Sequence, residues 1–150
     1  MVEHDWKNFP ELTNAQMGEL EFLSPHVQIK NDFRCVVVRV VDGDTIRVKC
    51  DFRDFDFPVR LGSIDAPEMN AGGEIAKAWL KDMIEGQEVE IKIDSNNRVG
   101  KYGRLLGDVY SMGMSMSEAM MSLGLALPFS QRNEGKLPDL NKIFRLEQWF

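Results

Sequence analysis

The 150-residue sequence is poor in cysteine and histidine, with two of each. Their spacing does not favour a zinc site, which needs closely spaced cysteine or histidine ligands. Cys35 and Cys50 flank a predicted hairpin at similar distances from its turn, so they can face each other across two strands. Because no secretion signal accompanies them, we expect free, half-buried thiols rather than a disulfide.

The sequence also lacks a segment that joins a basic start to an apolar run, and it has no membrane-length hydrophobic stretch. Its first residues, MVEHDWKNFPELTN, therefore predict neither a signal peptide nor a membrane span. We expect one of three settings: a cytoplasmic protein, an intracellular protein encoded by a phage or plasmid, or the mature form of a processed protein. No membrane partner is expected.

Basic residues are in deficit, with 18 Lys and Arg against 24 Asp and Glu, for a net charge of −6. Taken alone, this charge disfavours a polyanionic ligand. The deficit is uneven, because residues 1–33 hold two basic and six acidic residues and so account for −4 of it. The remainder is nearly neutral, so local patches decide what it attracts.

Apolar patterning predicts a mainly β fold behind a short helical extension. Thr13 and Gln16 form a capping-box pattern that predicts a helix over about 14–23. Alternation predicts five strands, and helical spacing predicts three further helices. The strands are expected at 34–41, 45–50, 55–64, 89–93 and 104–110, and the helices at about 74–85, 116–123 and from 139.

Five strands with a helix between the third and fourth are typical of the OB-fold. The predicted fold class is α+β, mainly β: a five-stranded OB-fold-like barrel with two to three helices over residues 33–150. Residues 1–32 form an acidic N-terminal extension with a short helix. No internal repeat or low-complexity tract competes with this interpretation, and we expect a monomer.

Acidic residues stand where the fold alone does not require them. In VDGDTIRV, residues 41–48, Asp42 and Gly43 are ordinary turn residues, with Gly43 expected at positive φ. Asp44 lies past the turn, and Asp65 and Glu68 follow in SIDAPE. Carboxylates contributed from separate strand ends suit a hard cation such as calcium or magnesium.

Two arginines accompany these acids. Arg60 lies on the polar face of its predicted strand, and the glycine-rich loop RVGKYGR supplies Arg104 beside Lys101 and Tyr102. Each of these residues alone is explained by a surface role, but a guanidinium group matches two phosphate oxygens. Acids and arginines together therefore suggest phosphate chemistry.

Three motifs, VVDGDTIRV, VRLGSIDAPE and GKYGRLLGDVY, resemble the thermonuclease family, also called staphylococcal nuclease-like domains. The resemblance covers roughly residues 33–127, in the family's order and spacing. It implies a calcium-dependent, largely sequence-nonspecific nuclease that hydrolyses phosphodiester bonds of DNA and RNA and leaves 3′-phosphates.

The resemblance implies one calcium ion per site. Asp44 and Asp65 match the family's calcium ligands, and Ala66 matches the position whose backbone carbonyl helps to bind the ion. Glu68 matches the proposed general base, and it also comes near the ion through a water molecule.

The resemblance also implies a set of phosphate contacts. Arg60 and Arg104 match the pair that holds the phosphate under attack, so that with Glu68 they form the catalytic set. Lys101 and Tyr102 match positions that contact a terminal phosphate of the bound nucleotide. DNA or RNA is the implied substrate.

One motif departs from the family pattern, and it keeps an alternative open. After GLAL, where the family usually has tyrosines of the nucleotide pocket, this chain reads PFSQRN and has Phe129 as its one aromatic. The alternative is a catalytically silent barrel that binds single-stranded nucleic acid or a protein partner. The net acidity fits a protein partner, but the retained acids and arginines favour the enzyme.

Overall fold

The structure, a computed structural model, describes residues 4–67, 72–100 and 103–128. No helix in these ranges combines the length and the apolar character needed to cross a membrane. The elements, in chain order, are α1 (Asn14–Leu20), the 3₁₀ helix η1 (Glu21–Leu23), β1 (Phe33–Asp42), β2 (Thr45–Cys50), β3 (Arg53–Leu61), β4 (Ile64–Asp65), α2 (Gly73–Ile84), β5 (Glu88–Lys92), β6 (Leu105–Ser111), β7 (Met114–Ser115), α3 (Met116–Ser122) and β8 (Leu127–Pro128).

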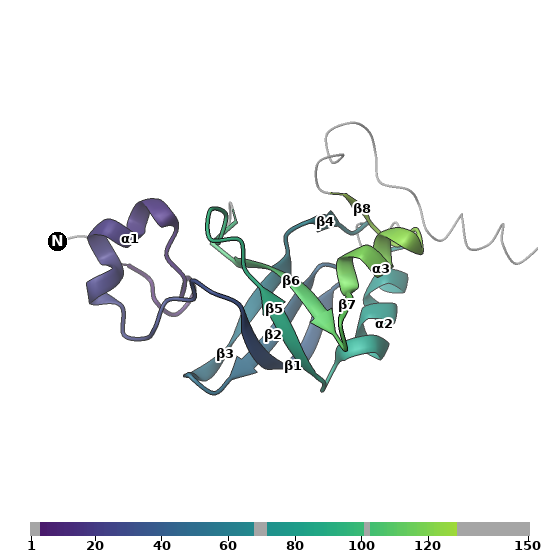
Figure 1. The fold of residues 1–150 in the computed structure, drawn as a ribbon, viewed down its shortest axis with the longest axis horizontal. Coiled ribbons are helices and arrows are strands. Elements are labelled where there is room, and N and C mark those ends of the chain that lie inside the picture. The colour runs from purple at the N-terminus through teal and green to yellow at the C-terminus, as the bar shows by residue number, and fades with distance from the viewer. Residues whose placement is uncertain (1–3, 68–71, 101–102, 129–150) are drawn as a thin grey trace, which may run out of the picture.

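The five longer strands form a closed, mixed β-barrel, as predicted (Figure 1). Neighbours pair antiparallel in the order β3-β2-β1-β5-β6, and a short parallel pairing of β3 with β6 closes the barrel. Gly107 lies in this pairing, and it also lets β6 pack closely on β5, because a Cβ there would lie 2.4 Å from Cγ2 of Ile91. The mainly β barrel with three α-helices confirms the OB-fold-like α+β class.

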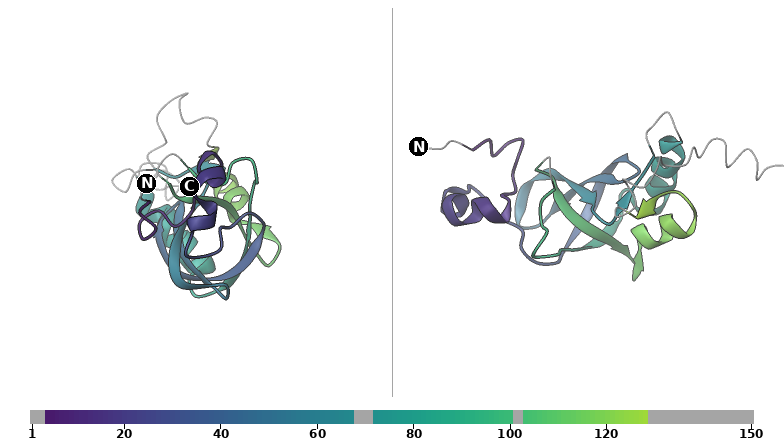
Figure 2. Two further views of the ribbon diagram at one scale, coloured as in Figure 1. Left: turned by 90° about the vertical axis from the view of Figure 1, so that its left-hand side faces the viewer. Right: turned by 90° about the horizontal axis from the view of Figure 1, so that it is seen from above.

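The core follows from the alternation of side chains along each strand. In β2, Ile46 and Val48 are buried inside the barrel, whereas the outward Lys49 is exposed. Helix α2 adds Ala76, Leu80 and Ile84 to the same core. Figure 2, on the left, looks along the barrel, and Figure 1 shows α2 and α3 together at one end of it.

Two details of the predicted strands were wrong. The strand expected over 55–64 ends at Leu61, and a turn at Gly62 and Ser63 separates it from β4. Strand β4 pairs antiparallel with β8, which the sequence did not predict because each has only two residues. The helix expected from residue 139 lies outside the described residues.

The N-terminal segment, residues 4–32, packs against the end of the barrel opposite α2 and α3 (Figures 1 and 2). Helix α1 has the predicted capping box between Thr13 and Gln16. β3 joins β6 only from Val59 onwards, so its earlier residues have no second strand partner among the described residues. The N-terminal segment fills this seam, where Glu11 forms a fully buried ion pair with Arg53.

Both cysteines are free and buried, which confirms the expectation of free thiols and corrects that of half-burial.

Candidate active site

Asp44 lies in the two-residue connection between β1 and β2, and three contacts hold it there. Its carbonyl accepts a hydrogen bond from the Leu61 N–H at 2.8 Å. One carboxylate oxygen, Oδ2, accepts the backbone N–H of Ala66 at 3.3 Å, and the other, Oδ1, accepts the hydroxyl of Thr45 at 3.1 Å. The carboxylate is therefore fixed between the start of β2 and the residue that follows β4.

Gly43 is required for a different reason from the one predicted. It does not adopt positive φ; instead, a Cβ there would lie 2.9 Å from the Cβ atoms of both Ala66 and Ala76. The β1–β2 turn thus packs directly on the segment after β4 and on helix α2. This close approach brings Asp44 next to Ala66.

Arg60 joins the two predicted acids. Its Nη2 atom lies 3.6 Å from Oδ2 of Asp44 and 3.3 Å from Oδ1 of Asp65. All three side chains are mostly buried, with exposed fractions of 11% for Arg60 and 16% for each aspartate. The structure therefore brings together residues from the β1–β2 turn, β3 and β4.

The turn at Gly62 and Ser63 makes this contact possible. In an unbroken strand, residues 60 and 65 would point to opposite faces and lie about 16 Å apart. The turn interrupts the strand instead, so that Asp65 lies 3.3 Å from Arg60, and Asp65 also pairs with Leu127 of β8.

Arg104 reaches the same site from the other side of the barrel seam. Its Nη1 donates to the Thr45 hydroxyl at 3.2 Å, and that hydroxyl in turn donates to Asp44. Thr45 also pairs with Arg60 across β2 and β3. Thr45 thus links Arg104 to Asp44 and lies opposite Arg60. It is a buried residue that sequence reasoning missed, although it directly follows Asp44 in DGDT.

The other predicted site residues are less fully placed. Glu68, Lys101 and Tyr102 lie outside the described residues. Ala66 is described, and its N–H faces Asp44, while the role of its carbonyl stays a prediction. Within the described ranges, no group of three His, Cys, Asp or Glu side chains is arranged to hold a metal ion.

Two carboxylates nevertheless provide the beginning of a cation site. Asp44 Oδ2 and Asp65 Oδ1 converge on one nitrogen atom, Nη2 of Arg60, so a positive charge already lies between them. Carboxylate oxygens are the ligands that calcium and magnesium prefer. The donor set therefore fits a hard divalent cation.

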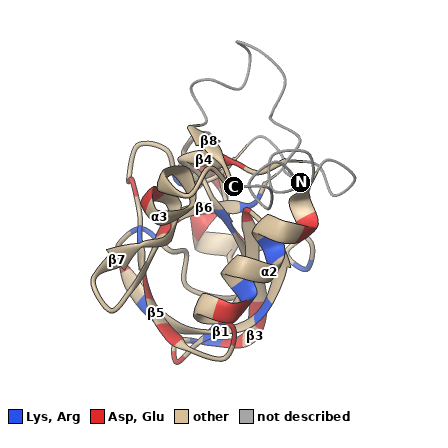
Figure 3. Cartoon of the chain, turned by 90° about the vertical axis from the view of Figure 1, so that its right-hand side faces the viewer, with Lys and Arg blue, Asp and Glu red and all other residues tan. Residues whose placement is uncertain are grey.

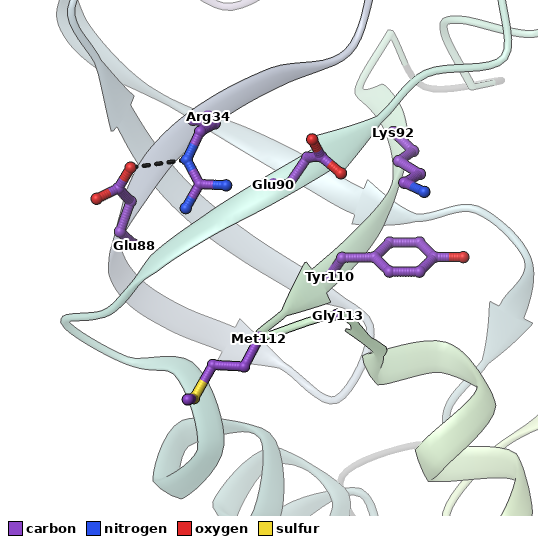
Figure 4. Close-up of a pocket in the computed structure, with 7 residues that line it drawn as sticks. All are labelled: Arg34, Glu88, Glu90, Lys92, Tyr110, Met112 and Gly113. Carbon is purple, nitrogen blue, oxygen red and sulfur yellow. Dashed lines mark hydrogen bonds and ion pairs between the residues drawn. The ribbon is translucent and has the colours of Figure 1, made fainter.

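A hollow of about 290 Å³ on the outer faces of β5 and β6 has a different character (Figure 4). Three of its four charged residues have partners there: Nε of Arg34 lies 2.8 Å from Oε1 of Glu88, and Nζ of Lys92 lies 4.2 Å from the ring centre of Tyr110. It also holds two carboxylates and two basic side chains, but its ion pair is about 60% exposed, unlike the mostly buried groups of the Asp44 site. Figure 3 likewise shows basic and acidic residues interspersed along α2 and the strands.

Comparison with known proteins identifies the family of the chain. The model of the family described as staphylococcal nuclease homologue matches residues 58–148. The chain therefore belongs to the family of staphylococcal nuclease homologues.

Three curated proteins illustrate the similarity. A micrococcal nuclease of Shigella flexneri is 44% identical over 81 residues, which make up 53% of this chain and 44% of that protein. An uncharacterized endonuclease of Escherichia coli O157:H7 is 38% identical over 99 residues, or 65% of this chain and 61% of that protein. Endonuclease YncB of Bacillus subtilis is 34% identical over 113 residues, or 69% of this chain and 52% of that protein. The chain thus spans 44 to 61% of the length of these relatives.

Proposed function

We propose that the protein is a calcium-dependent nuclease that hydrolyses phosphodiester bonds of DNA and RNA and leaves 3′-phosphates. Membership of the family and the names of the relatives support hydrolysis of nucleic acid. The observation that carries the proposal is the position of Arg60, whose guanidinium contacts both Asp44 and Asp65. Since contacts to phosphates read no sequence, we expect little sequence preference.

Hydrolysis of a phosphodiester needs positive charge arranged around the transition state, because the anion repels nucleophiles and its leaving oxygen is poor. When bound, a calcium ion held by Asp44, Asp65 and the carbonyl of Ala66 supplies such charge and orients a water molecule.

The arginines supply the rest of the positive charge. Arg60 and Arg104 approach Thr45 from β3 and from the loop before β6, and in this proposal both guanidinium groups bind oxygens of one phosphate. When substrate binds, the Arg60 guanidinium gives up part of its contact with Asp44 and Asp65 and contacts the phosphate instead. Glu68 accepts the proton of the attacking water, and Lys101 and Tyr102 contact a terminal phosphate.

We assign the catalytic unit to residues 33–150, acting as a monomer, and treat residues 1–32 as an extension. The test measures cleavage of a labelled single-stranded oligonucleotide with calcium, with chelator, and in the variants Arg104→Ala and Glu68→Ala. Each variant should lose about 100- to 1,000-fold in rate. Arg39→Ala, an exposed arginine on β1, should cleave like the unchanged chain.

Several outcomes contradict the proposal. Cleavage that persists in chelator, or full rates in both variants, would exclude the assigned chemistry. Products that phosphatase treatment leaves unchanged would exclude 3′-phosphate ends. Binding of the oligonucleotide that survives chelator, with no product after long incubation, would instead support the silent binding barrel.

A further inference from the structure

A groove of about 580 Å³ lies between the N-terminal segment and strands β2 and β3. Aromatic and basic side chains line it together: Trp6, His26 and Phe55 supply rings, and Lys7 and Arg47 supply positive charge. It is a separate hollow from the one drawn in Figure 4, which lies over β5 and β6.

The three rings form a continuous edge-to-face series. The ring centres of Trp6 and His26 are 6.0 Å apart at 89°, and those of His26 and Phe55 are 5.1 Å apart at 71°. His26 is fixed by a 2.7 Å hydrogen bond from Nε2 to the carbonyl of Pro10. All three side chains are partly exposed, so the series offers ring surface to a flat apolar ligand.

Strand register places this groove beside the candidate active site. Arg47 pairs with Pro58 in the groove, and two residues further along the same strands Thr45 pairs with Arg60. Residues two apart in a strand share a face and lie about 7 Å apart. Arg47 and Pro58 therefore lie on the outer face of β2 and β3 that carries Arg60. Phe55 lies further along β3, about 16 Å from Arg60 by strand geometry, on the side that packs against the core.

A second contact links the groove to Arg104. The N-terminal segment runs from Trp6 through Phe9 to Pro10, and the Phe9 ring occupies the space where Gly103 has no side chain. A Cβ on Gly103 would lie 2.5 Å from Cδ1 of Phe9. Because Gly103 directly precedes Arg104, the same short segment borders both the groove and the loop of the second arginine.

The charged residues that line the groove carry a small excess of positive charge, with Lys7 and Arg47 against Asp56. Arg47 forms an ion pair with Asp56 at 2.7 Å, and Lys7 adds a further positive charge at the rim. Aromatic platforms beside basic residues are the means by which proteins bind single-stranded nucleic acid, with bases stacked on the rings and phosphates near the cations.

We propose that this groove is a nucleobase subsite, in which one base of a single-stranded substrate stacks on the Trp6, His26 and Phe55 rings while another part of the same strand lies at Arg60 and Arg104. The inference rests on the proposed function for its substrate class. It assigns to the N-terminal segment a direct part in substrate binding.

The test compares binding of two oligonucleotides of equal length, one of thymidines and one with abasic units, in chelator so that no cleavage occurs. Trp6→Ala should bind the thymidine strand about 5- to 150-fold more weakly, the range that one stacked base contributes. The same variant should bind the abasic strand like the unchanged chain. Phe22→Ala, which removes an 81% exposed aromatic from the same segment outside the groove, should change neither affinity.

Equal losses on both strands, or no loss on either, would overturn the subsite. A second measurement needs no variant: a strand containing 5-bromouracil is photocrosslinked to the unchanged chain and the linked residue is mapped. Linkage at Trp6, His26 or Phe55 supports the subsite, and linkage at Tyr110 instead overturns it. Cleavage with calcium is assayed separately, so absence of turnover refutes the nuclease while base-dependent binding still reports on the groove.

Discussion

Glu11 and Arg98 form an ion pair in which both side chains are almost wholly buried, with exposed fractions of 1% and 3% and a separation of 3.1 Å between Oε2 and Nη2. The other carboxylate oxygen of Glu11 contacts Nη2 of Arg53. Arg98 also donates from Nε to the carbonyl of Ile29 at 2.7 Å and from Nη1 to that of Leu12 at 2.9 Å. One carboxylate therefore joins the N-terminal segment to β3 and to the loop before β6.

Replacing Glu11 by glutamine should lower the free energy of unfolding by about 3–5 kcal/mol, because removal of one partner leaves buried charge without compensation. Chemical denaturation measures the change. Glu19→Gln removes the same charge from an exposed position on α1 and should have little effect. A chain that starts at Asp32 should be destabilised as well, since Arg53 and Arg98 both lose their carboxylate. Equal stability of the Glu11 and Glu19 variants would show that the pair contributes nothing.

The barrel could be predicted because each long strand carries its own signal. The alternation of apolar and polar residues in TIRVKC predicts which residues of β2 face inward. This prediction needs no information about residues elsewhere in the chain. Strands β4 and β8 are too short to show a period, and they exist because Ile64 and Asp65 meet Leu127 and Pro128 across the fold. No local sequence pattern predicts the pairing of β4 with β8.

The acids of the candidate site were identifiable for a similar reason. Asp44 and Asp65 stood where turn chemistry did not require them, and the structure brings both to Arg60. The roles of Gly43 and Thr45 depend on groups that approach from elsewhere in the chain, so residue type alone did not reveal them. The burial of Glu11 was hidden by the general acidity of its segment.

The two thiols should be unreactive in the folded protein. Burial raises the pKa of the Cys35 thiol from its ordinary 9.0 to about 12, and burial likewise raises the pKa of Cys50. A disulfide-exchange reagent at pH 8 should titrate two thiols after denaturation and almost none before it. Prompt reaction of the folded chain would contradict the burial, and absence of reaction in denaturant would reveal a disulfide.

The raised pKa of Cys35 makes the free energy of unfolding depend on pH in the alkaline range. Above pH 9 the unfolded chain releases the Cys35 proton while the folded chain retains it, so unfolding becomes more favourable. The contribution of Cys35 to stability is fully present below pH 9 and is lost as the pH rises towards 12. Cys35→Ala should flatten this part of the pH profile relative to the unchanged chain.

Arg60 should have opposite effects on cation binding and on catalysis. Its guanidinium lies between Asp44 and Asp65, where it repels a second positive charge. Arg60→Ala should therefore bind calcium more tightly in a calorimetric titration, yet cleave oligonucleotide about 100- to 1,000-fold more slowly. Arg39→Ala is the control for loss of one positive charge. Weaker calcium binding in the Arg60 variant would show that the arginine organises the carboxylates instead of competing for them.

Thr45 should act as a positioning residue, because its hydroxyl accepts from Arg104 and donates to Asp44. Thr45→Val keeps the shape of the side chain but removes both hydrogen bonds. Loss of the partner that orients a metal ligand typically costs about 10- to 100-fold in metal affinity or activity. We expect that loss in kcat/KM and a parallel loss in calcium affinity.

Thr45→Ser restores the hydroxyl and should recover both quantities. This rescue separates positioning from packing, since serine lacks the methyl group that valine retains. If serine fails while valine retains calcium affinity and turnover, the hydrogen bonds at Thr45 are irrelevant, and the arginine from the loop before β6 must be oriented by other contacts.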